Sequence, residues 1–210
     1  MADPRPDSED TVRLLERIAA GDQAAVDGLL ARHRPIMRAL IAGRLDPAIR
    51  ARIDPSDVVQ DALAEVVRRL PDYLIRRPMP FHLWVLKAAY ERALNLRRNH
   101  RAARRNVARE AQEPDQSSLA LAHSLACTGP TPSEAVQAQE AERQVVRALE
   151  DLSDADREIL ILRQVDELPY DEIAVLLDME APAARQRYGR ALIRLQKSLA
   201  AHGFTGGNIG

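Results

Sequence analysis

The sequence is poor in aromatic residues, has one cysteine and contains no long apolar run. Phe, Trp and Tyr make up 3% of the 210 residues, and valine and isoleucine do not form alternating runs, which argues against a β-sheet protein. The single cysteine, Cys127, excludes an internal disulfide and a multi-cysteine zinc site. Because there is no long apolar run and no basic, apolar N-terminus, we expect a cytoplasmic protein with neither a membrane span nor a signal peptide.

Alanine, leucine, arginine and glutamate dominate what remains, and all four favour helices. Apolar residues recur at helical spacing through most of the chain, so the fold class is predicted to be all-α. The length suits one or two small domains. The formal net charge is −1, so any affinity for nucleic acid must come from local basic clusters and not from the charge of the whole chain.

The clearest pattern lies in residues 168–199. Two apolar-periodic segments are separated by residues 178–180, which leave room only for a turn, and Pro182 suits the first turn of the second helix. Residues 181–198 contain five basic residues and no acidic one. The pattern predicts a helix-turn-helix whose second helix meets DNA. An ordinary pair of packed helices with a solvated basic face has the same periodicity.

Two segments nearer the N-terminus also carry recognisable patterns. Asp54-Pro55-Ser56-Asp57 is typical of a helix start, and the helix that follows presents polar acceptors on one face, as a solvated acidic surface also does. Residues 71–80 contain three prolines and are predicted to form a loop. A long helix is expected from Phe81 onwards.

Aromatic and basic residues are concentrated around this long helix. Four of the seven aromatic residues in the chain lie here: Tyr73, Phe81, Trp84 and Tyr90. Six arginines follow without an acidic residue among them: Arg97, Arg98, Arg101, Arg104, Arg105 and Arg109. Aromatic rings beside a basic run are typical of a surface that binds single-stranded nucleic acid. The alternative is a core of aromatic residues and a solvated helix end.

Composition also divides the chain into domains. Residues 110–142 contain no lysine or arginine and six acidic residues, and Ser, Gln, Thr and Pro accumulate there. We interpret residues 110–139 as a flexible acidic linker between helical domains at residues 11–109 and 140–200. Residues 1–10 and 202–210 are expected to be disordered tails.

Taken in order, these segments resemble the bacterial RNA polymerase sigma factors of the extracytoplasmic-function class. The segment DPSDVVQDALAEVVRRL is similar to the polymerase-binding helix of that family, and PMPFHLWVLKAAYERALNLRR is similar to its promoter-melting helix. The segment that runs from LEDLSDADREIL to ALIRL resembles its C-terminal domain. The phrase DPSDVVQ and the aromatic loop are most similar to the planctomycete-type group within the class.

The resemblance implies a factor that binds core RNA polymerase and directs promoter-specific transcription initiation. Its partners are then promoter DNA and core polymerase, the latter through the coiled coil of the largest subunit and through the flap. Core-polymerase contacts are expected from Asp57, Gln60, Asp61 and Glu65. Contacts with the melted −10 element are expected from Tyr73, Arg76, Arg77, Phe81, Trp84, Lys87, Asn95, Arg97 and Arg98. Contacts with the −35 element are expected from Ala183, Ala184, Arg185, Gln186, Arg187, Arg190 and Arg194.

Within the last group the side chains differ in what they recognise. Arg185 and Gln186 lie near the start of the second helix and suit guanine and adenine edges, whereas Arg187, Arg190 and Arg194 suit phosphates.

The chain departs from the family pattern at the turn of the helix-turn-helix. The family has Leu-Gly-Ile-Ser where this chain has Leu177-Asp178-Met179-Glu180, so a residue other than glycine must take the left-handed geometry of the turn. Asn95 and Ala88 stand where the family often has aspartate and isoleucine, which leaves the promoter preference open.

No catalytic or metal site emerges from the sequence. The five histidines are scattered without ligand spacing, and there is no glycine-rich phosphate loop, so no enzyme activity, cofactor or metal is expected. A self-sufficient helix-turn-helix regulator that dimerises on palindromes is the chief alternative, and an all-helical adaptor is a second. Control by an anti-sigma protein, by phosphorylation of a linker Ser or Thr, or by expression level stays open.

Overall fold

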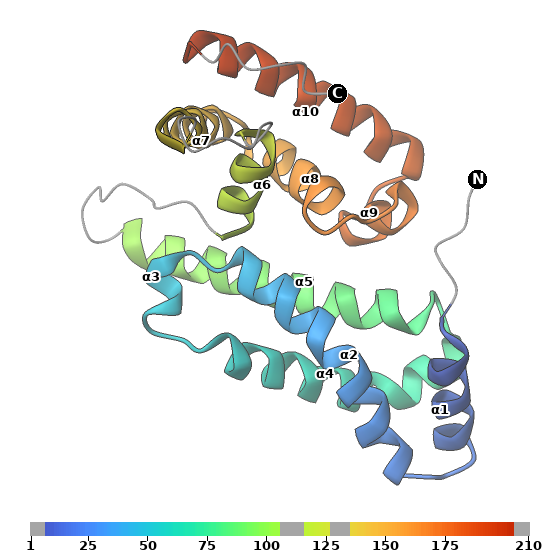
Figure 1. Ribbon diagram of the computed structural model, residues 1–210. Coiled ribbons are helices and arrows are strands. Elements are labelled where there is room, and N and C mark those ends of the chain that lie inside the picture. The colour runs from blue at the N-terminus through green and yellow to red at the C-terminus, as the bar shows by residue number, and fades with distance from the viewer. Residues whose placement is uncertain (1–6, 106–115, 127–134, 204–210) are drawn as a thin grey trace. The chain divides into compact units, whose positions relative to one another are not determined.

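The computed structural model of the chain describes residues 7–105, 116–126 and 135–203 (Figure 1). All regular secondary structure in these residues is helical, which confirms the predicted all-α class. The chain divides into two compact units, Met1–Glu113 and Pro114–Gly210. Each unit has buried apolar residues of its own.

Five helices make up the described part of the N-terminal unit. They are α1 (Glu9–Ala19), α2 (Ala24–Arg44), α3 (Pro47–Arg50), α4 (Pro55–Arg76) and α5 (Phe81–Arg105). α2 packs against α1, α4 and α5, and α4 also packs against α5 (Figure 1). Leu29, Met37 and Ile41 of α2 are fully buried, so this helix is the centre of the unit.

Aspartate side chains cap the starts of α3 and α4. Asp54 accepts a hydrogen bond from the backbone N–H of Ser56 at 2.7 Å, and Pro55 is the first residue of α4. Asp46 accepts one from Ile49 at 2.9 Å at the start of α3. Such caps satisfy backbone donors that have no partner within the helix. The helix start predicted before α4 is confirmed.

The N-terminal segment is bound to the start of α5. The carboxylate of Asp7 accepts hydrogen bonds from the backbone N–H groups of Phe81 at 2.6 Å and His82 at 2.8 Å, so it caps α5. The expectation of a disordered N-terminus is therefore wrong for residues 7–10, whose last two residues begin α1. Residues 1–6 lie outside the described residues.

Two prolines lie inside helices without ending them. α4 continues through Pro71 to Arg76, so the loop predicted for residues 71–80 is wrong over that stretch. α2 likewise continues through Pro35. A proline inside a helix removes one backbone hydrogen bond. Burial of side chains beyond it, such as Tyr73 at 4% exposure, offsets the loss.

The described part of the C-terminal unit also has five helices. They are α6 (Gln116–Ala126), α7 (Ala135–Glu150), α8 (Asp154–Gln164), α9 (Tyr170–Leu176) and α10 (Ala181–Ala201). α10 packs against α7, α8 and α9. Four consecutive residues of α8, from Ile159 to Leu162, are buried, which places this helix at the centre of the unit.

α6 lies within the stretch that the sequence indicates as a flexible linker. It packs against α7 and α8 through Leu121 and Ala122, whose side chains are almost fully buried. Six of its eleven residues are leucine or alanine, but the stretch around it is rich in Ser, Gln, Thr, Pro and acidic residues, and that composition led to the prediction of a linker. The linker residues 110–115 and 127–134 lie outside the described residues, as do residues 204–210. The expectation of a disordered C-terminal tail is wrong for residues 202 and 203, because His202 caps the end of α10 and bonds Asp151 at 2.9 Å.

Candidate nucleic-acid interface

α9 and α10 are joined by residues 177–180, one of which has left-handed backbone geometry. Asp178 has a φ of 50°. The backbone N–H of Met179 donates to the carbonyl of Ala174 at 2.9 Å and closes the end of α9. Aspartate tolerates this geometry better than most residues other than glycine. The prediction that Asp178 takes the left-handed position is confirmed, and Pro182 lies in the first turn of α10.

One side of α10 is buried and the opposite side is exposed. Ala184 and Ala191 are fully buried, whereas Ala183, Arg185 and Gln186 are exposed. Ala184 therefore cannot face a base edge, and its place among the expected −35 contacts is corrected. Neighbouring residues on a helix point about 100° apart, so a continuous stretch of sequence cannot share one face.

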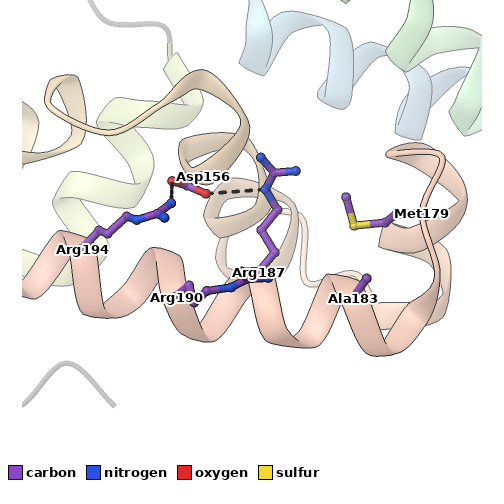
Figure 2. Close-up of a pocket in the computed structure, with 6 residues that line it drawn as sticks. All are labelled: Asp156, Met179, Ala183, Arg187, Arg190 and Arg194. Carbon is purple, nitrogen blue, oxygen red and sulfur yellow. Dashed lines mark hydrogen bonds and ion pairs between the residues drawn. The ribbon is translucent and has the colours of Figure 1, made fainter.

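Three arginines follow one edge of α10, next to α8. They border a pocket of about 320 Å³ (Figure 2). The residues that line it are Asp156, Met179, Ala183, Arg187, Arg190 and Arg194. The α10 members are three, four or seven residues apart, so they lie on one side of the helix.

Asp156 of α8 is the acidic residue in this pocket, and it pairs with two of the three arginines. Its carboxylate is 3% exposed, accepts a hydrogen bond from Nη1 of Arg194 and lies 3.5 Å from Nε of Arg187 (Figure 2). Burial raises the pKa of Asp156, but the hydrogen bonds with Ser153 and Arg194 and the charges of both arginines bring it below the ordinary 3.8. The carboxylate is ionised at neutral pH, and three arginines against one carboxylate leave the pocket positive.

Arg185 lies against a different helix, α9. Its guanidinium carbon is 5.2 Å from the ring centre of Tyr170, and that of Arg163 is 4.9 Å from the same ring. Cation–π contacts of this kind hold a guanidinium in place at the surface. Gln186 is exposed beside it. Both residues expected to read base edges are thus accessible, and one of them has a fixed position.

Sequence reasoning missed Asp156, Tyr170 and Arg163. Asp156 stands three residues after Ser153, a spacing typical of a helix start, and its backbone N–H does bond the Ser153 hydroxyl at 3.2 Å. That local role accounts for the residue by itself. The one signal for a second role is that α10, with many arginines and no acid, needs an acidic partner from elsewhere.

The aromatic residues expected to hold a base form a cluster inside the N-terminal unit. The ring centres of Tyr73, Phe81 and Trp84 are 4.6 to 5.6 Å apart, and the Tyr73 hydroxyl donates to the carbonyl of Met79 at 2.9 Å. Phe81 is 0% exposed and Tyr73 4%, so neither ring offers a face to a base in this structure. Trp84 is partly exposed. The cluster joins the end of α4 to the start of α5.

The polar residues expected at the −10 element lie at the surface. Four are exposed and two are partly exposed: Arg76, Arg77, Asn95 and Arg98, and then Lys87 and Arg97. Arg77 ends α4 with a φ of 38° and so has left-handed geometry. Arg76 and Arg77 lie at the end of α4, between Tyr73 and Phe81 in sequence, whereas the others lie along α5.

The polar face of α4 lies near its N-terminal end. It is formed by Asp57, Gln60, Asp61 and Glu65, of which the last is partly buried. Asp61 pairs with Arg92 of α5, and Glu65 pairs with Arg68 and with Arg69 at 2.6 Å. Exposed pairs of this kind contribute little to stability, so these carboxylates exchange partners at small cost.

The part of the chain that the structure describes contains no group of three His, Cys, Asp or Glu side chains able to hold a metal ion. None of its helices is long and apolar enough to cross a membrane. Cys127 lies outside the described residues.

Comparison with known proteins finds similarity to sigma factors. The model of sigma-70 region 4 matches residues 142–195, which contain α8, α9 and most of α10. The sigma-E factor of Escherichia coli K12, an extracytoplasmic-function sigma factor, is 28% identical over 180 residues, which cover 85% of this chain and 88% of that protein. The RNA polymerase sigma-H factor of Pseudomonas aeruginosa is 28% identical over 193 residues, covering 91% and 94%.

Two solved structures have a similar fold. CnrH, in complex with the cytosolic domain of CnrY, aligns with a TM-score of 0.56 at 23% identity and covers 92% of this chain and 99% of its own. The sigma factor RpoE of Bartonella quintana, in complex with the anti-sigma factor NepR, aligns with a TM-score of 0.51 at 18% identity, covering 83% and 96%. The chain is thus similar over most of its length to extracytoplasmic-function sigma factors, and its residues 142–195 match sigma-70 region 4. Its assignment to the planctomycete-type group stays a prediction.

Proposed function

We propose that this sigma factor binds core RNA polymerase and directs transcription from promoters that it contacts at two elements, with α10 at the −35 element and α5 at the −10 element. The observation that carries the proposal is the exposed, acid-free face of α10 within the segment that matches sigma-70 region 4. A helix of this kind suits the major groove, where arginine and glutamine read base edges.

The surface of the N-terminal unit supports the second contact. Arg76 and Arg77 are exposed at the end of α4, and the partly exposed Trp84 packs against Tyr73 of the same helix end, so this part of the unit offers a single strand two cations and one aromatic ring. The buried rings of Tyr73 and Phe81 fix the backbone there and do not stack on bases themselves. We propose that Asn95, Arg97 and Arg98 extend the same contact along α5.

Core polymerase is proposed to bind the polar face of α4. Asp57, Gln60 and Asp61 are exposed and suit charge-assisted hydrogen bonds with a basic coiled coil. A contact of the C-terminal unit with the flap is proposed in addition. This role uses binding alone, so no catalytic group or cofactor is proposed, and it takes place in the cytoplasm with the polymerase. An anti-sigma protein is proposed as a further partner. RpoE was solved in complex with the anti-sigma factor NepR, and CnrH in complex with the cytosolic domain of CnrY.

Run-off transcription tests the proposal. Purified core polymerase transcribes a pool of genomic fragments with and without this chain, and the new start sites are sequenced. We expect discrete starts that share two spaced upstream elements. Binding of the chain to DNA without polymerase, and no new starts with it, would instead identify a self-sufficient regulator.

Two variants separate the proposed contacts in the same assay. Asp61→Lys reverses a charge on the polar face of α4. We expect it to lower holoenzyme formation at least tenfold, because the proposed attraction between Asp61 and the basic coiled coil of the polymerase becomes a repulsion. Asp27→Lys makes the same change on an exposed residue of α2 and is the matched control. Equal holoenzyme assembly by both variants contradicts docking through α4.

A further inference from the structure

We propose that Asp156 is a positioning residue for DNA recognition: it holds Arg187 and Arg194 so that, with Arg190, they present a fixed set of donors to one backbone phosphate of DNA. The inference rests on the proposed function of α10. Asp156 belongs to α8 and not to the helix that meets DNA, so its effect on binding passes through the arginines.

The carboxylate of Asp156 is placed to orient both side chains. It is nearly inaccessible to solvent, and its helix is anchored by the buried residues that follow it. It contacts one nitrogen of each arginine, Nε of Arg187 and Nη1 of Arg194 (Figure 2). Arg194 donates a hydrogen bond to it, whereas Nε of Arg187 lies 3.5 Å away in an ion pair without a hydrogen bond. A guanidinium has five N–H donors in a rigid plane, so the hydrogen bond fixes the direction of the other donors of Arg194, and the charge of the carboxylate holds Arg187 beside it.

Both arginines keep exposed surface while bound to Asp156. The side chain of Arg187 is 36% exposed and that of Arg194 is 58% exposed. Each therefore presents its outer donors towards solvent while its inner nitrogen faces the carboxylate. A salt bridge that served the core alone would bury the arginines with the acid.

The pocket suits a phosphate diester. Three arginines and one carboxylate leave it with two net positive charges, and its volume of about 320 Å³ accommodates such a group. Ala183, one turn before Arg187, contributes only a methyl group to the lining, and Met179 lines the pocket beyond it (Figure 2). Phosphate contacts of this kind fix the register of a recognition helix on the duplex.

Removal of the charge of Asp156 distinguishes two effects on DNA binding: orientation of the arginines by the carboxylate, and repulsion of phosphates by its charge. An acidic residue near DNA repels phosphates, so its neutralisation alone strengthens binding and steepens the dependence on salt. If Asp156 orients the arginines, its neutralisation instead weakens binding to the −35 element and lowers discrimination. The two mechanisms predict opposite signs.

The test uses the full-length chain in holoenzyme with Asp156→Asn, a substitution of almost equal shape. The probes are a promoter found by run-off transcription and the same promoter with its −35 element scrambled. The ratio of transcription from the two templates measures −35 discrimination. We expect this ratio to fall about tenfold in the variant, since loosely held arginines contact phosphates of any sequence equally well.

Asp151→Asn is the matched control. Asp151 also bonds α10, through Ser198 at 2.5 Å and His202 at 2.9 Å, but it touches none of the three arginines. We expect its ratio to equal that of the unmodified chain. Asp156→Asn in an Arg187→Gln, Arg194→Gln background is expected to cause no further loss, because the residues through which it acts are gone.

Circular dichroism shows whether Asp156→Asn unfolds the C-terminal unit. If it does, a second variant tests the inference. Arg194→Lys keeps the charge and removes the planar fork, and we expect it to lower the ratio severalfold. An unchanged ratio in either folded variant, or tighter binding by Asp156→Asn, overturns the inference. Absence of new start sites with the unmodified chain would refute the proposed function instead, so the two failures are distinguishable.

Discussion

At the scale of single residues, the burial of His33 links the stability of the N-terminal unit to pH. His33 is 7% exposed, its Nε2 is 3.2 Å from the Thr11 hydroxyl, and its ring packs edge-on against Phe81. Burial lowers the pKa of His33 to about 4 from an ordinary 6.5. The folded chain therefore binds the proton of this histidine more weakly than the unfolded chain does.

The sign of the resulting pH dependence follows from linkage. Above pH 6.5 the histidine is neutral in both states and its stabilising effect is complete; between pH 6.5 and about 4 the unfolded state takes up a proton that the folded state does not. We expect the free energy of unfolding to fall by about 2 to 3 kcal/mol across this window. Urea titrations at a series of pH values measure it.

His33→Gln keeps a hydrogen-bonding group near Thr11 but does not titrate. In this variant we expect the free energy of unfolding to fall much less between pH 6.5 and 4 than in the unmodified chain. The effect of Asp7 stays apart from it, because hydrogen bonds outweigh burial and hold the pKa of Asp7 below 3.8, so its stabilisation is lost only at still lower pH. An equal slope in His33→Gln and the unmodified chain would contradict the assignment.

Residues whose role is local were predictable from the sequence, and residues whose role depends on packing were not. Asp178 takes left-handed geometry because of its place in a turn, which the sequence displays. Ala184 is buried and Asp156 pairs across helices, and both facts depend on how α8 meets α10. A sequence pattern describes one helix at a time and does not show which residues of another helix pack against it.

At the scale of helices, the end of α4 offers a comparison between adjacent arginines. Arg76 is the last helical residue, whereas Arg77 has left-handed geometry with a φ of 38°. Glycine tolerates left-handed geometry and is the preferred residue just beyond a helix end. We expect Arg77→Gly to raise the free energy of unfolding by about 0.5 to 1 kcal/mol.

Arg76→Gly removes the same charge from a helical position and is the matched control. At this helical position glycine lowers the free energy of unfolding by about 0.5 to 1 kcal/mol, so the two variants should change stability in opposite directions. Chemical denaturation measures both. Destabilisation by both variants would show that Arg77 makes contacts worth more than its backbone strain. In run-off transcription each is expected to weaken use of the −10 element, since each removes a cation from the proposed strand-binding surface.

The same helix shows why three prolines misled the prediction of a loop. Pro71 removes one backbone hydrogen bond, but Tyr73 beyond it is buried against Phe81 and Trp84. Only Pro78 and Pro80 lie in the break between α4 and α5. Proline content indicated the region of the break, and packing of the aromatic cluster set its position.

At the scale of the whole molecule, the chain is two units joined by a stretch whose middle is folded. α6 belongs to the C-terminal unit, where Leu121 and Ala122 pack against α7 and α8. The C-terminal domain predicted at residues 140–200 leaves this helix out. The functional unit that carries α10 is therefore longer than the segment matched by sigma-70 region 4, residues 142–195.

Truncation measures what α6 contributes. A fragment of residues 114–210 retains the helix, and a fragment of residues 135–210 lacks it. Removal of α6 exposes the surfaces of α7 and α8 against which it packs. Loss of one buried leucine and its neighbours corresponds to about 2 to 4 kcal/mol, so we expect the shorter fragment to unfold at clearly lower urea concentration.

Leu121→Ala in the longer fragment isolates the packing of α6 from its length. Leu121 is 1% exposed, so its truncation leaves a cavity between α6 and the helices beneath it, and the stability should fall between those of the two fragments. If all three proteins unfold at the same urea concentration, α6 is not part of the unit. If they separate in the expected order, the span between the two DNA contacts is shorter than residues 110–139, because α6 moves with the −35-binding unit.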